Sequence, residues 1–133
     1  TPGHSMFLDK KSRYLFAGDD VCSDVTGCGP GATPGRPNGQ YANLTTYRDC
    51  LKKLIARMDE FDYLFPGHFM VNLENYLLLN LYEALNEIIA DPSSYDYKVV
   101  QTGGDGTKRE RMHKFVKGFG TIAYTANGVY PPK

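Results

Sequence analysis

Two short β-like runs in this sequence each stop at a glycine or a Pro-Gly pair and lead directly to a side chain of a metal-binding type. The run at 14–17 is followed by Asp19, and the run at 61–65 is followed by His68; a further Pro-Gly pair precedes His4. Side chains just beyond strand ends are held stiffly by the backbone. Imidazole nitrogen and carboxylate oxygen are the donors that zinc and related divalent ions accept in proteins. The pattern therefore predicts strands whose ends meet at a metal site formed by His4, Asp19 and His68.

Apolar periodicity predicts two main helices. In the segment 43–60, apolar residues recur at steps of three and four while charged residues fall on the opposite side, which is typical of an amphipathic helix. The segment 73–90 has a wider apolar surface and stops before Asp91-Pro92. A helix this apolar is expected to be covered on more than one side.

Alternating and β-branched runs predict the strands. Residues 6–9 and 13–17 are expected to form a hairpin, and residues 97–100, 108–116 and 121–125 are expected to form three antiparallel strands. Together with the strand at 61–65, these elements predict an α/β fold of mixed or antiparallel strands flanked by two main helices.

Glycine and proline dominate the segment 20–41, which predicts a long loop. Loops of this length in a compact domain are usually functional or disordered. Because the segment begins next to Asp19, two interpretations stay open. It is either a wall or lid over the site or a passive connection.

The motifs at 1–5, 15–19 and 64–68, which read TPGHS, LFAGD and LFPGH, resemble in order the last three metal-binding motifs of the metallo-β-lactamase-fold hydrolases. The resemblance implies that His4 is a ligand of one metal, that the catalytic residue Asp19 bridges two metals, and that His68 completes the second site. It also implies one or two zinc ions, with iron or manganese as alternatives. These ions would activate water for attack on a small-molecule ester, thioester, amide or phosphodiester.

The chain departs from that family because its defining His-x-His-x-Asp-His signature is absent and because Ser5, after His4, is followed directly by Met6-Phe7-Leu8 instead of a small-residue stretch with a further Gly. The histidines are His4, His68 and His113, and the sequence opens at Thr1 on a motif. We therefore expect residues 1–133 to be a single, partial domain, the C-terminal half of an αββα sandwich that is inactive alone. Bare apolar surface then predicts a homo-oligomer or a separate N-terminal half as partner. A non-catalytic half-domain that acts by association is the alternative, and a small domain whose Pro-Gly-His segments merely form turns is a third.

Composition excludes several classes of partner. The chain has 15 basic and 15 acidic residues, so no global field favours nucleic acid. The basic run at 108–117 is expected to be a solvated strand face rather than a phosphate or RNA site. With no apolar stretch of about 20 residues and no signal peptide, the sequence predicts a soluble cytoplasmic protein that does not bind membranes.

The cysteines and the remaining histidine are weaker candidates for functional residues. The three cysteines lack both the spacing of a zinc knuckle and the even number of a disulfide framework, so reduced thiols are expected. Cys22 lies three residues after Asp19, and we expect it to be a bystander, with an approach to a metal as the alternative. His113 is expected to be a surface or packing residue.

Overall fold

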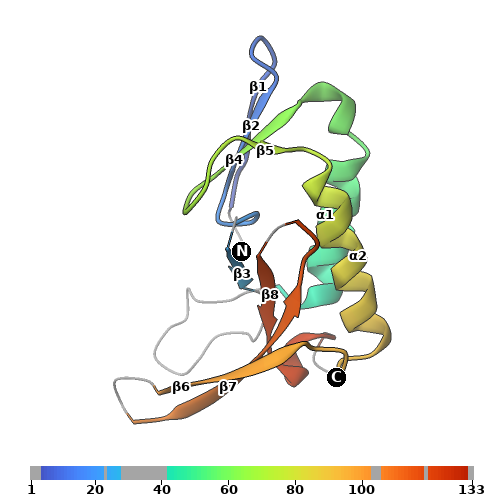
Figure 1. Ribbon diagram of the computed structural model, residues 1–133. Coiled ribbons are helices and arrows are strands. Elements are labelled where there is room, and N and C mark those ends of the chain that lie inside the picture. The colour runs from blue at the N-terminus through green and yellow to red at the C-terminus, as the bar shows by residue number, and fades with distance from the viewer. Residues whose placement is uncertain (1–3, 23, 28–41, 103–105, 119, 132–133) are drawn as a thin grey trace.

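A computed structural model describes residues 4–22, 24–27, 42–102, 106–118 and 120–131 as two α-helices, two short 3-10 helices and two mixed four-stranded sheets (Figure 1). At this level the predicted α/β class is confirmed. Within the described ranges, neither helix has the length and apolar character needed to cross a bilayer.

The first sheet has the order β1-β2-β4-β5. Its strands are β1 (Phe7–Asp9), β2 (Tyr14–Gly18), β4 (Tyr63–Pro66) and β5 (Leu73–Glu74). The predicted β1–β2 hairpin is confirmed. β4 lies parallel to β2, and this relation could not be read from the sequence because the two strands are separated by a long crossover. Parallel neighbours bring the carboxyl ends of β2 and β4 to the same edge.

The second sheet has the order β3-β8-β7-β6. Its strands are β3 (Val25–Gly27), β6 (Tyr97–Thr102), β7 (Lys108–Phe115) and β8 (Thr121–Tyr124). The predicted antiparallel arrangement of the last three strands is confirmed. Figure 1 shows the β6–β7 hairpin projecting away from the helices.

β3 corrects one prediction, because it lies inside the segment 20–41 that was expected to be a loop throughout. Val25 and Thr26 are β-branched, and Thr26 is buried. The strand pairs in parallel with β8, and the amide of Thr121 donates to the carbonyl of Asp24 at 2.7 Å. Residue 23 and residues 28–41 of that segment lie outside the described residues.

Both helices are shorter than the periodicity predicted. α1 (Leu44–Ile55) is capped by Asn43, whose side chain accepts from the amide of Thr46, and a separate 3-10 turn, η1 (Met58–Glu60), follows it. α2 (Leu77–Ala90) starts four residues later than the predicted residue 73. A second 3-10 turn, η2 (Ala126–Gly128), follows β8.

The late start of α2 has a physical cause. Asn72 has a φ of 62°, which takes the chain out of the helical region. Leu73 and Glu74 then pair with β4 as strand β5. The Asn75 side-chain amide donates to the carbonyls of Met58 and Phe61, which fixes the turn before the helix.

The core joins the helices to both sheets. α1 and α2 pack against each other along one side of the sheets (Figure 1). Leu15 and Leu64, neighbours on β2 and β4, are buried on the side that faces the core, as is the α2 stripe Leu77, Leu78, Leu81, Leu85 and Ile88. Leu79 on the same helix is 48% exposed, so the expectation that α2 is covered on more than one side holds only in part.

The opposite face of the first sheet carries an aromatic cluster, which we call the aromatic face. Alternation along the strands places these five rings on one side: Phe7, Tyr14, Phe16, Tyr63 and Phe65. Phe7 and Phe16 are paired across the strands and remain 70% and 45% exposed. The Phe16 and Phe65 ring centroids are 5.3 Å apart, within the usual range of packed aromatic pairs. A layer of this kind normally packs against further protein.

Candidate metal centre

Gly18 ends β2 and shapes the first half of the site. Its φ is +57°, a left-handed conformation that glycine adopts without a steric penalty. A Cβ at this position would lie 2.6 Å from Cε1 of His4, so a larger residue would require that imidazole to shift. The glycine that follows the β-run therefore suits both the left-handed turn and the observed position of the His4 ring.

Gly67 performs a related task after β4. Its amide donates to the carbonyl of Gly18 at 3.0 Å, which continues the parallel pairing beyond the strands. A Cβ on Gly67 would lie 2.7 Å from Oδ1 of Asp19. The glycine thus lets the carboxylate lie directly against the second chain segment.

Asp19 and His68 meet at this edge of the sheet. The distance from Asp19 Oδ1 to His68 Nε2 is 3.2 Å. The side chains are 65% and 63% exposed, so both are open to a substrate or an ion from solvent. The predicted approach of these two residues therefore appears in the structure as a direct contact.

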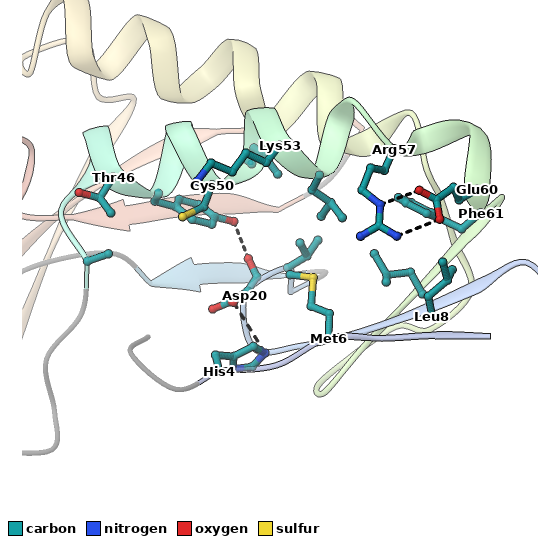
Figure 2. A pocket seen from close by; sticks show the side chains of 16 residues that line it. His4, Met6, Leu8, Asp20, Thr46, Cys50, Lys53, Arg57, Glu60 and Phe61 are labelled. Atoms are coloured by element: carbon teal, nitrogen blue, oxygen red, sulfur yellow. Dashed lines mark hydrogen bonds and ion pairs between the residues drawn. The ribbon is translucent and has the colours of Figure 1, made fainter. Parts of the chain in front are cut away.

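His4 takes a different position. Its Nε2–H donates to the carbonyl of Ala17 at 3.0 Å, and the same nitrogen lies 3.7 Å from Oδ2 of Asp20. Figure 2 shows the His4 ring directed toward Asp20. Because Nε2 carries the proton in this arrangement, Nδ1 is the nitrogen with a lone pair for a ligand.

The three predicted ligands thus form two pairs, Asp19 with His68 and His4 with Asp20. In the portion of the chain that the structure describes, no three His, Cys, Asp or Glu side chains gather closely enough to hold an ion together. Asp20 is a polar residue of the site that the sequence interpretation did not include. Its position directly after Asp19 was the available signal.

The separation of Asp19 and His68 fits a shared ion and equally fits a direct hydrogen bond or ion pair. Two donors at about 2.0–2.1 Å from a tetrahedral ion lie roughly 3.4 Å apart. The observed separation of 3.2 Å is close to that value. An oxygen and an imidazole nitrogen also suit zinc, iron and manganese.

Cys22 contacts the backbone of Asp19 and is not a member of the Asp19–His68 pair. The residue is buried, and its thiol donates to the carbonyl of Asp19 at 3.4 Å. Burial, assisted by the charges of Asp19 and Asp20, raises the pKa of this thiol. Through this hydrogen bond Cys22 supports the backbone of Asp19. Cys22 and Cys50 are both free thiols, whereas Cys28 lies outside the described residues.

His113 and the basic strand are remote from the pair in the architecture. His113 is buried between β6 and β8, where its Nδ1 lies 3.1 Å from Thr121 Oγ1 and its ring stacks on Tyr97. The expectation of a packing role is confirmed. Two of the nearby lysines are paired with acids, Lys98 with Glu110 at 2.8 Å and Lys114 with Glu87 at 2.7 Å.

Comparisons of the chain with protein-family models, with curated proteins and with solved structures gave no match.

Proposed function

We propose that this chain supplies Asp19 and His68, together with His4, to the metal centre of a hydrolase of the metallo-β-lactamase superfamily. The observation that carries the proposal is the 3.2 Å contact between Asp19 and His68 at the carboxyl ends of adjacent parallel strands. Ligand sites in α/β proteins favour that edge of a sheet. The ordered motifs around these residues agree with the same assignment.

Each residue has a distinct task in the proposed centre. A bound zinc, iron or manganese ion would lower the pKa of a coordinated water so that it can hydrolyse an ester, thioester, amide or phosphodiester. The carboxylate of Asp19 offers oxygen donors and a negative charge that favours cation binding. The imidazole of His68 must be neutral to offer Nε2, so ion affinity falls in acid. The carbonyl of Ala17 holds the ring of His4 in one orientation.

The donors present do not complete such a centre. The aromatic face supports the proposal that a further layer of protein packs on the first sheet. The chain contains three histidines, one of which packs against Thr121. Catalytic zinc usually has three protein ligands. We propose that the remaining donors come from a second polypeptide segment whose sheet packs on the aromatic face, as in an αββα sandwich. The chain by itself would then bind metal weakly and show no turnover.

A titration of zinc into the chain tests the metal centre. We expect the imidazole proton resonances of His68 to shift on saturation, and Asp19→Asn and His68→Ala to abolish the binding. His113→Gln is the matched control, because it removes a histidine from the second sheet and should leave the binding unchanged. Zinc binding that survives in both Asp19→Asn and His68→Ala would refute the assignment.

Reconstitution tests the hydrolase. Adding a polypeptide that carries a His-x-His-x-Asp-His segment should produce metal-dependent turnover of a generic ester or thioester. Asp19→Asn should remove that turnover. Equal turnover by the Asp19→Asn chain would show that the carboxylate has no part in the reaction.

The aromatic face also favours the second candidate, a non-catalytic half-domain that acts by association with itself or with a separate half. Light scattering over a dilution series measures self-association. We expect Phe7→Ser with Phe16→Ser to dissociate the oligomer, while Val100→Ser, at an exposed position on β6, should not. A chain that is monomeric before any substitution would exclude self-association.

A further inference from the structure

A cavity of about 570 Å³ lies between the β1–β2 hairpin and α1 (Figure 2). Cavities that hold small molecules in proteins usually measure roughly 300–1,000 Å³. The cavity therefore has the size of a small-molecule site. Its wall includes His4, the third proposed metal ligand, but neither Asp19 nor His68.

Most of the wall is apolar. Met6, Leu8 and Leu15 come from the hairpin side, and Leu51 and Leu54 come from α1. Phe61, which is 1% exposed, closes one end beside the charged pair of Arg57 and Glu60. An apolar chain inside this space would exchange water for hydrocarbon contacts, which is favourable in proportion to the area buried.

The wall contains two cations, Lys53 and Arg57, and two anions, Asp20 and Glu60, and these groups differ in whether they are paired. Arg57 binds Glu60 through two hydrogen bonds of 2.6 and 2.9 Å, and Asp20 faces His4 at 3.7 Å. Lys53 forms no hydrogen bond or ion pair with the residues that the structure describes. Figure 2 shows Lys53 on the α1 side of the cavity, near Cys50 and opposite His4.

We propose that this cavity binds an amphiphilic small molecule with an unbranched apolar chain and a carboxylate head, a fatty acid. The chain lies between the hairpin and α1, and the carboxylate pairs with the ammonium of Lys53. A carboxylate head is proposed because Lys53 has no hydrogen bond or ion pair with the described residues and would gain a charge-assisted partner. Asp19 and His68 do not line the cavity, and the fatty-acid proposal does not require metal binding by that pair.

Binding of decanoate below its micelle concentration tests the proposal, with isothermal titration calorimetry as the measurement. Lys53→Glu should weaken decanoate binding by at least about tenfold, the effect of losing one charge-assisted contact. Lys52→Glu is the matched control, because Lys52 is exposed on the same helix and does not line the cavity. It should change the affinity less than twofold.

Two further measurements separate the head from the chain. Decanol has the same chain without the charge. It should bind the unaltered protein more weakly than decanoate does, and it should bind Lys53→Glu as tightly as it binds the unaltered protein. Saturating decanoate should also slow alkylation of the exposed Cys50 by iodoacetamide, followed by mass spectrometry. The proposal is overturned if decanoate does not bind, if Lys52→Glu weakens binding as much as Lys53→Glu, or if decanol binds as tightly as decanoate.

Discussion

The β2–β4 pair and the β6–β7 pair are both two-stranded units of this protein, yet they are built on opposite principles. β2 and β4 are parallel, come from distant parts of the chain, and bury alternate residues such as Leu15 and Leu64. β6 and β7 are antiparallel neighbours in sequence, and every residue of β6 except the partly buried Val99 is exposed. The parallel pair therefore combines the core with the candidate site, whereas the hairpin adds only Met112 of β7 to the core cluster and nothing to the site.

This contrast has a physical origin. A parallel pair needs a long crossover, and its formation costs loop-closure entropy that only core burial can offset. The parallel pairing places the carboxyl ends of two distant chain segments at one edge of the sheet. This arrangement brings Asp19 next to His68. A hairpin closes locally and can remain exposed because its backbone is paired within itself.

The largest effect should come from truncating the core side of the parallel pair. Leu64 is fully buried on β4, and Leu64→Ala should lower the free energy of unfolding by about 2–5 kcal/mol. Val100 on β6 is 58% exposed, and Val100→Ala should cost less than about 0.5 kcal/mol. Urea denaturation of the two variants measures the difference. Equal losses would mean that the hairpin is as strongly coupled to the core as the parallel pair.

A pair of glycines gives the next largest effect. Gly106, in the β6–β7 connection, has a φ of +78° and open space around it, so Gly106→Ala should cost only the left-handed strain of about 1–2 kcal/mol. Gly18→Ala should cost more, because the new methyl group would also collide with the ring of His4. Denaturation gives both values, and the His4 resonances should move only in Gly18→Ala. Equal losses in the two variants would show that His4 moves aside at no cost in free energy.

The smallest effect is a dependence of stability on pH that arises from the second sheet. Burial, with the nearby charge of Arg111, lowers the pKa of His113 below its ordinary value. The unfolded chain therefore takes up this proton first as the pH falls. Stability should decrease below about pH 6.5, where the unfolded histidine titrates, and should be retained above it.

Unfolding at pH 7.5 and pH 5.5 measures that dependence. His113→Gln should flatten it, whereas His68→Gln, which replaces the exposed histidine of the first sheet, should change it less. If His68→Gln produced the larger flattening, the pH response would belong to the candidate site rather than to the packed sheet.

Local patterns were sufficient for much of the second sheet and for both helices. The three antiparallel strands follow from alternation and from turns between sequence neighbours, and the buried α2 stripe follows from the spacing of its leucines. The helix start at residue 73 was wrong because β5 uses Leu73 and Glu74 to pair with β4. β3 was missed because its partner, β8, lies almost one hundred residues away in the sequence.

For the candidate site, the sequence by itself determined which groups are present and where the chain must turn. A glycine or a Pro-Gly pair before Asp19 and His68 sets the ends of two strands, since these residues interrupt regular structure. Only the tertiary structure decided which groups meet. The parallel register of β2 and β4 brings Asp19 to His68, and the left-handed turn at Gly18 places His4 against Ala17 and Asp20. Contacts of this kind depend on strand pairing across a long crossover, and local residue preferences contain no information about that pairing.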